Sequence, residues 1–411
     1  MADRLRCALH STRQSERGQA LLTILLVIGV GIAALVYTLA TPANLSIAND
    51  KKTAAALAQA KAALIGRAAS DQTIPGSLPC PDIVTNIPGT NIPNDGIADL
   101  FAGNQCPSYI GRLPWRTLGL PDLRDGSGER LWYALSPNFR DDSSASPLNS
   151  DTSGQLTITG TAPATNVIAI VFSPGAVVGT QVRNAANQNN ATNYLEGGNE
   201  DGDTNYITGA SSPTFNDKLL PITSDALFSV VAMRVAREVR TFLTTYFNTN
   251  GYYPFATRYT DPTYNCTLGV TSGRIPNPSA LPNISVACLG LADWLPGVSQ
   301  PPAWFTANNW HLVTHYALAP ACTFPLSNLV TQCAGAGGLL TVQGIPAPNN
   351  DKRAIVIVTG RGLSGQLRPG GTSVTDYLED PENTNGGDGD TVFIKPVLSP
   401  TDNDRLVVVS P

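Results

Sequence analysis

The sequence predicts an α+β protein in which a long N-terminal transmembrane helix is followed by two tandem heads, each a helix packed on an antiparallel β-sheet. The chain holds 37 Gly and 32 Pro among 411 residues, which is typical of a turn-rich protein with much β structure. Apolar residues recur at helical spacing in two segments, and a set of strand-like blocks occurs twice in one order. A helix and a sheet each need a partner for their apolar face, so we expect each helix to cover its own sheet.

The N-terminus combines a basic leader with an apolar run. Residues 1–18 carry four Arg against two acidic residues, and residues 20–40 contain no charge. About 20 apolar residues in a helix cross a bilayer, and the basic side stays in the cytoplasm. We therefore expect a cytoplasmic leader at 1–18, a transmembrane helix at 19–42 and an exported remainder. A cleaved secretory signal and a plain uncleaved anchor are the alternatives, although the apolar run is longer than an ordinary signal core.

Two further segments have the composition and spacing of helices. Residues 43–70 are rich in Ala, Lys, Leu and Gln, which favour helix and would extend the N-terminal helix. From Ser224, an expected N-cap, apolar residues recur at helical spacing as far as Asn250, and Gly251 follows as an expected stop signal.

A tandem duplication accounts for the rest of the chain. Five blocks of the first half recur in the second half in the same order: RLWYALSP with VTHYALAP, SGQLTITG with GGLLTVQG, NVIAIVFSPG with RAIVIVTGRG, NYLEGGNEDGDTNYIT with DYLEDPENTNGGDGDTVFIK, and NDKLLPIT with NDRLVVVS. Alternating and continuous apolar patterns in these blocks predict strands. The first head therefore covers residues 43–222 and the second, divergent head covers residues 223–411.

The leader and the apolar run resemble the N-terminus of type IV pilins and of type II secretion pseudopilins. Gly18 matches the residue after which a prepilin peptidase cuts, so Gln19 would begin the mature chain. The resemblance implies that the apolar helix is kept as membrane anchor and packs with other pilin subunits. Thr23 stands where the family usually has Glu, and the loss of that charge is typical of a tip or initiation subunit.

Two acidic, Gly-rich loops occupy matching places in the repeats, and the resemblance implies that such a loop can bind calcium. Hard cations prefer six to eight oxygen ligands, which a Gly-rich loop can bring together. Solvated turns are the alternative, because Asp, Asn and Gly are common turn residues. The candidate ligands are Glu200, Asp201 and Asp203 in the first loop and Asp388 and Asp390 in the second.

Six cysteines follow the leader, and an even number in an exported chain favours disulfides. Several connectivities are open. Closure between nearest neighbours predicts the pairs Cys80–Cys106, Cys266–Cys288 and Cys322–Cys333.

The net charge and the absence of known catalytic and nucleotide-binding motifs reduce the number of possible functions. The net charge is −5, and the chain after residue 18 is more acidic still, which disfavours nucleic acid as a partner. No nucleophile elbow, P-loop or dinucleotide fingerprint occurs, so we expect no enzyme. We expect a minor pilin or pseudopilin subunit in the bacterial inner membrane, with its heads in the periplasm or on a surface filament. The alternative is a membrane-anchored binding protein or adhesin that does not polymerise.

Overall fold

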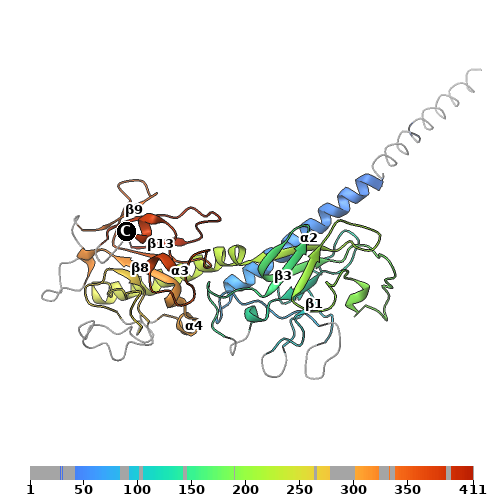
Figure 1. Cartoon of the computed structure of the whole chain (residues 1–411), viewed down its shortest axis with the longest axis horizontal. Coiled ribbons are helices and arrows are strands. Elements are labelled where there is room, and N and C mark those ends of the chain that lie inside the picture. The colour runs from blue at the N-terminus through green and yellow to red at the C-terminus, as the bar shows by residue number, and fades with distance from the viewer. Residues whose placement is uncertain are drawn as a thin grey trace, which may run out of the picture.

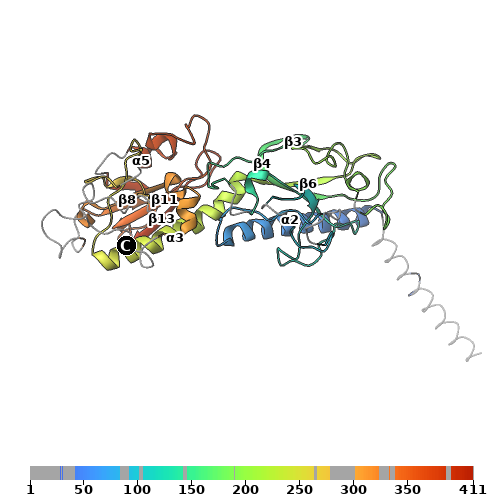
Figure 2. The same ribbon diagram turned by 90° about the horizontal axis from the view of Figure 1, so that it is seen from below.

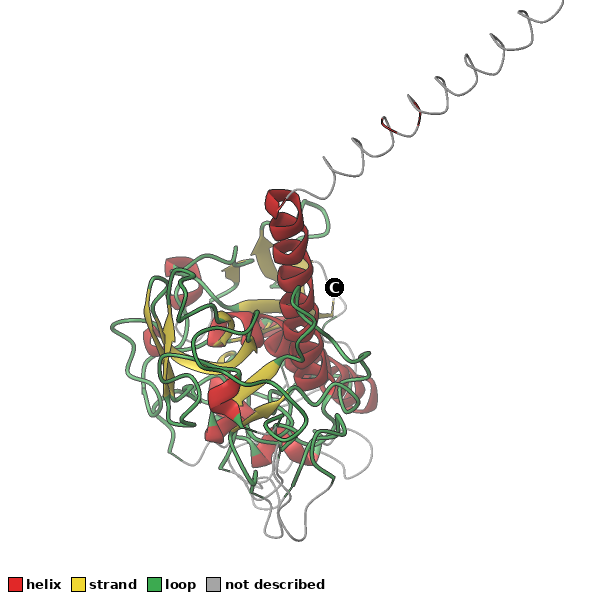
Figure 3. Ribbon diagram, turned by 90° about the vertical axis from the view of Figure 1, so that its right-hand side faces the viewer, coloured by secondary structure: helices red, strands yellow, loops and turns green. Residues whose placement is uncertain are grey.

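The computed structural model describes residues 42–83, 92–100, 105–141, 146–188, 190–262, 266–277, 301–323, 338–385 and 390–410, together with Ile28, Val30 and Cys333. Within these residues the chain is an α+β protein, as the sequence predicts. Two units lie side by side along the long axis, and helix α3 (Ser224–Asn250) runs from one into the other (Figure 1). Loops make up much of the end-on view (Figure 3), in agreement with the Gly- and Pro-rich composition.

The first unit is a helix on a six-stranded sheet. Its elements are α2 (Pro42–Ser70), β1 (Ile110–Arg112), β2 (Trp132–Leu135), β3 (Leu156–Gly160), β4 (Ala164–Ser173), β5 (Asn205–Thr208) and β6 (Lys218–Thr223). The strand order is β1-β2-β4-β3-β5, and β6 pairs with the other edge of β4. Helix α2 contacts β4 and β6 and lies below the sheet in Figure 2.

The second unit contains the same kinds of element. They are α3, β7 (Ser272–Arg274), α4 (Ala303–Ala307), β8 (Thr314–Leu318), β9 (Leu340–Gln343), β10 (Asp351–Lys352), β11 (Ala354–Val358), α5 (Pro381–Thr384), β12 (Val392–Ile394) and β13 (Arg405–Ser410). One sheet has the order β13-β11-β8-β7 and the other the order β10-β9-β12. Helix α3 contacts β11 and β13.

The strand pairings of the two units correspond one to one. Strands β1, β2, β3, β5 and β6 match β7, β8, β9, β12 and β13, and the long β4 matches β10 and β11 together. Most pairs are antiparallel, but β3 pairs with β5 and β9 with β12 in parallel. The prediction of a purely antiparallel sheet is therefore wrong for one strand pair in each unit. The two units therefore share their strand pairing as well as their similar sequence blocks.

Helix α3 begins and ends close to the expected positions. The Thr223 side chain, rather than that of Ser224, accepts the hydrogen bond from the Ala226 amide at 3.3 Å, so the N-cap lies one residue earlier than predicted. Gly251 follows the helix with a φ of 78°, a left-handed conformation that glycine adopts without a Cβ clash.

Both units share one hydrophobic core. A single cluster of buried side chains extends from α2 through the first sheet and α3 to the strands of the second unit. Phe228 on α3 joins the two halves, because its ring lies 6.2 Å from that of Phe139 and 6.3 Å from that of Trp310. The units therefore pack as one body.

Polar contacts fix the units at the same junction. Asn149 Nδ2 donates to the Asn308 carbonyl at 2.9 Å, and Arg368 Nε donates to Asp151 Oδ1 at 2.6 Å. The Arg368 and Asp151 side chains are only 2% and 11% exposed. This ion pair from one unit to the other is largely removed from water.

The described chain contains no membrane-spanning helix. None of its helices is long and apolar enough to cross a bilayer. Helix α2 is long, but Lys51, Lys52 and Lys61 lie within it. The predictions of a long transmembrane helix, a single-pass membrane contact and an inner-membrane location are therefore wrong for the part of the chain that the structure describes. The segment 19–41 lies outside the described residues except for Ile28 and Val30.

The cysteine pairs follow the nearest-neighbour prediction where both partners are described. Disulfides join Cys80 to Cys106 and Cys322 to Cys333. Cys266 is also disulfide-bonded, and its expected partner Cys288 lies outside the described residues. These bonds indicate folding in an oxidising compartment.

Candidate functional site: the acidic loop and its arginine cluster

The carboxylates proposed for calcium in the first head bind backbone of their own loop. The Glu200 carboxylate accepts from the Gly198 amide at 2.9 Å, and Asp201 accepts from the Asp203 amide at 3.0 Å. Asp203 in turn accepts from the Asn205 amide at 2.6 Å. These are short-range turn contacts, and Asp201 and Asp203 are exposed. The side chains follow the turn one after another and do not converge on a common point.

The second loop is described only in part. Asp390 accepts from the Val392 amide at 3.0 Å, and Asp388 lies outside the described residues. Among the described residues, the acidic side chains that come within 4.8 Å of one another in a group of three are Glu379, Asp402 and Asp404, of which Glu379 belongs to the second acidic loop. The calcium site therefore stays a prediction: Asp201, Asp203 and Asp390 accept hydrogen bonds from turn amides, and Asp388 is not described.

Glu196 and Asp217 form a buried contact between the acidic loop and the last strand of the first head. The Glu196 amide donates to Asp217 Oδ2 at 2.9 Å, and the Asp217 amide donates to Glu196 Oε2 at 3.2 Å. Asn199 also donates from Nδ2 to Asp217 Oδ2 at 2.9 Å. Burial first, and then the neighbouring Glu196 charge, raise the pKa of Asp217 to about 8.

The second head has a related contact, in which Glu379 lies beside Asp402 and Asp404. The Asn403 amide donates to Glu379 Oε2 at 3.2 Å, as the Asn216 amide does to Glu196 Oε2 at 3.0 Å. Asp404 is 1% exposed, and burial raises the pKa values of both Asp404 and Glu379. Both heads thus bring two carboxyl groups together at one matched position.

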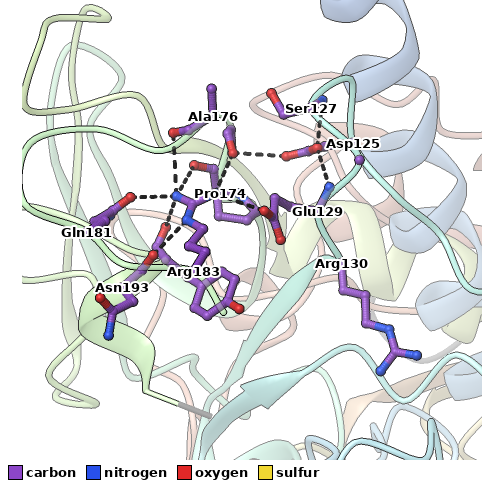
Figure 4. A network of polar contacts seen from close by, with 12 residues as sticks. Asp125, Ser127, Glu129, Arg130, Pro174, Ala176, Gln181, Arg183 and Asn193 are labelled. Atoms are coloured by element: carbon purple, nitrogen blue, oxygen red, sulfur yellow. Dashed lines mark hydrogen bonds and ion pairs between the residues drawn. The ribbon is translucent and has the colours of Figure 1, made fainter. Parts of the chain in front are cut away.

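In the first head, Arg183 connects the loop after β4 to the segment that contains Asn193 (Figure 4). Its guanidinium donates to the carbonyls of Asn193 and Gly175, both at 2.6 Å, and to Gln181 Oε1 at 2.7 Å. It also lies 3.5 Å from Glu129, and its side chain is 4% exposed. The guanidinium nitrogens all donate to groups of the same head, which indicates a structural role for Arg183.

A tyrosine lies beneath two guanidinium groups in each head. Arg112 and Arg183 lie over the Tyr194 ring, with Cζ 4.3 and 5.0 Å from the ring centroid. In the second head the corresponding residues are Arg274, Arg368 and Tyr377, at 4.7 and 5.1 Å. Such cation–π contacts are favourable when they are removed from water. We call each set the arginine–tyrosine cluster of its head.

Asp125 anchors the neighbouring turn in Figure 4. Its Oδ1 accepts from the amides of Ser127 and Glu129 at 2.8 and 2.9 Å, and its Oδ2 accepts from Ser173 Oγ and the Gly175 amide at 2.8 and 2.9 Å. The carboxylate is fully buried. It joins the turn before β2 to the end of β4 and has no lone pair directed outward for a ligand.

Among the described residues, the closest approach to a catalytic arrangement is a buried histidine. His315 Nε2 lies 3.3 Å from Ser272 Oγ, and its Nδ1 lies 3.0 Å from Tyr259 Oη. Burial lowers the pKa of His315 to about 3. A general base works best when its pKa is near the working pH, so this imidazole is a weak base for activating Ser272 at neutral pH. The group fits packing between β7 and β8.

The paired carboxyls and the arginine–tyrosine clusters were not predicted from the sequence. Their signal was present in the aligned repeat blocks, where Arg183 matches Arg368 and NYLE matches DYLE. The expected processing residues, Gly18 and Gln19, lie outside the described residues.

Comparison of the chain with protein-family models, with curated proteins and with solved structures gives no match.

Proposed function

We propose that this chain is a non-enzymatic structural subunit of an extracytoplasmic pilin-type filament, a type IV pilus or a type II secretion filament. The observation that carries the proposal is the pair of matched helix-on-sheet heads packed on one core. A helix on a mainly antiparallel sheet is the head architecture that the resemblance to pilins implies. The disulfides support a place outside the cytoplasm.

The chemistry of the described polar groups also favours a structural role. Arg183 and Asp125 bind backbone and side chains of their own head, and the His315 imidazole is a weak base. Side chains that are fully bonded within the fold give rigidity but leave little capacity for substrate. A subunit that transmits contacts between neighbours needs such rigid loops.

The proposed position of the subunit within the filament is inferred from Thr23. Pilins of the resembled family usually carry Glu there, and its carboxylate pairs with the N-terminal amine of a neighbouring subunit. A chain with Thr23 cannot make that repeating ion pair. We therefore propose a minor subunit that starts or caps the filament.

Filament purification from the native cell tests the proposal. We expect the full chain to sediment with sheared filaments in far smaller amount than the major subunit. Thr23→Glu should raise its amount per filament because the repeating contact is restored. Recovery of the folded, disulfide-bonded chain entirely outside the filament fraction would instead support an extracytoplasmic binding protein or adhesin.

A further inference from the structure

Glu196 and Asp217 lie together at the base of the first acidic loop, and one of their carboxylate oxygens has no hydrogen-bond donor in the described part of the chain. Glu196 and Asp217 exchange backbone-to-carboxylate hydrogen bonds, and the two carboxyl groups also interact with each other. Asp217 Oδ1 is buried and has no hydrogen-bond donor within the described structure. A carboxyl proton placed between the two side chains supplies the missing donor.

The charges around this pair do not neutralise it. Arg183 is the cation that faces it, 3.9 Å from Glu196 Oε1, and Arg183 is shared with Glu129. Gln181 and Asn199 are neutral donors, and Lys218 lies in an ion pair with Asp50 at 2.5 Å. Two buried carboxylates with one shared arginine leave an excess negative charge that is costly in a poorly solvated site.

The second head has a related cluster, in which carboxylate oxygens of Glu379, Asp402 and Asp404 lie within 4.8 Å of one another and the Asp404 amide donates to Asp402 Oδ1 at 3.4 Å. Asp404 Oδ2 is buried without a donor in the described structure, just as Asp217 Oδ1 is. Asp402 stands where the first head has Phe215, and Asp380 adds to the negative potential at Asp402. Arg368 is the facing cation, and the Tyr259 hydroxyl is the remaining titratable neighbour. The unpaired oxygen is therefore a property of the repeated motif.

We propose that one proton held between Glu196 and Asp217 fastens the acidic loop of the first head to the residue that precedes β6. Loss of the proton leaves two facing carboxylates, whose repulsion favours separation of loop and strand. The acidic loop of the first head is then held closed at low pH and opens more often as the pH rises. This inference does not depend on the proposed function.

The sign of the pH effect follows from proton binding. The folded first head holds a proton that an unfolded aspartate, with an ordinary pKa of 3.8, releases. The stabilisation by this proton is complete below pH about 4, weakens as the pH rises, and is lost as the pH passes about 8. The loop should therefore open more often at pH 8.5 than at pH 5.

Hydrogen exchange of the full chain tests the proposal. For peptides covering residues 196–208, we expect the opening equilibrium constant, corrected for intrinsic exchange, to rise by at least about tenfold from pH 5 to pH 8.5. Asp217→Asn should abolish this rise, because the amide supplies a permanent donor to Glu196. Glu196→Gln is a second isosteric test if Asp217→Asn folds poorly. Asp203→Asn, in the same loop but exposed, is the matched control and should keep the rise.

Three results would overturn the proposal. The first is a loop opening that is independent of pH in the unsubstituted chain. The second is an equal pH dependence in the chain with Asp217→Asn. The third is protection that appears only when calcium is added and disappears with chelator, because a metal ion would then occupy the place of the proton.

Discussion

Replacing Arg183 should destabilise the protein more than replacing any exposed arginine of the same head. Arg183→Met keeps an unbranched side chain but removes three short hydrogen bonds, to Asn193, Gly175 and Gln181. Hydrogen bonds from a charged donor contribute about 1.5 kcal/mol each at the low end. The substitution also leaves Glu129 and Glu196 without their cation. We therefore expect the free energy of unfolding to fall by about 3 to 5 kcal/mol, the usual cost of breaking a buried pair.

A matched control separates burial from charge. Arg124 pairs with Asp122 at 2.7 Å, but its side chain is 45% exposed. Arg124→Met should cost less than about 1 kcal/mol, as exposed ion pairs do. Arg183→Lys should recover only part of the loss, because an ammonium group cannot reproduce the planar fork of hydrogen bonds.

Urea unfolding of the full chain, followed by circular dichroism, measures these differences. Both heads share one core, so we expect one main transition. Equal destabilisation by Arg183→Met and Arg124→Met would refute the structural role assigned to the buried arginine.

Three further predictions concern other parts of the chain. Removing the Cys80–Cys106 bridge with two serines should lower the free energy of unfolding by about 3.5 kcal/mol, since the bridge closes a loop with a sequence separation of 26, and denaturant titration checks this. Asp201→Asn together with Asp203→Asn should leave the melting temperature unchanged in calcium and in chelator, because both side chains bind only their own turn; a calcium-dependent shift lost in this variant would contradict that reading. Mass spectrometry of the N-terminal peptide should find Gln19 first, and a start at Thr41 would support a secretory signal instead.

The repeated fold could be predicted because helices and strands are encoded by patterns of neighbouring residues. Apolar spacing marked α3 nearly to its ends, and the strand blocks kept their order in both halves. The one-residue difference at the N-cap arose because Thr223 and Ser224 both suit a cap, and only the backbone geometry decides between them. Nearest-neighbour pairing is confirmed for the two bridges whose cysteines are both described, and each of them closes a short stretch of chain.

The site was harder to predict because its partners are far apart in the sequence. Glu196 and Asp217 meet only when β6 pairs with β4, and their burial cannot be read from a polar, Gly-rich loop. The parallel pair of β3 and β5 likewise depends on tertiary packing between distant segments. The spacing of Asp201 and Asp203 suggested ligands, yet the same spacing lets each carboxylate accept an amide two residues later.

Immunogold electron microscopy of filaments from the native cell tests the central claim most directly. With antibody against the second head, we expect label at filament ends and little along the shaft. Label distributed along the whole shaft would contradict the minor position, and filaments without label beside labelled free protein would contradict the filament role itself.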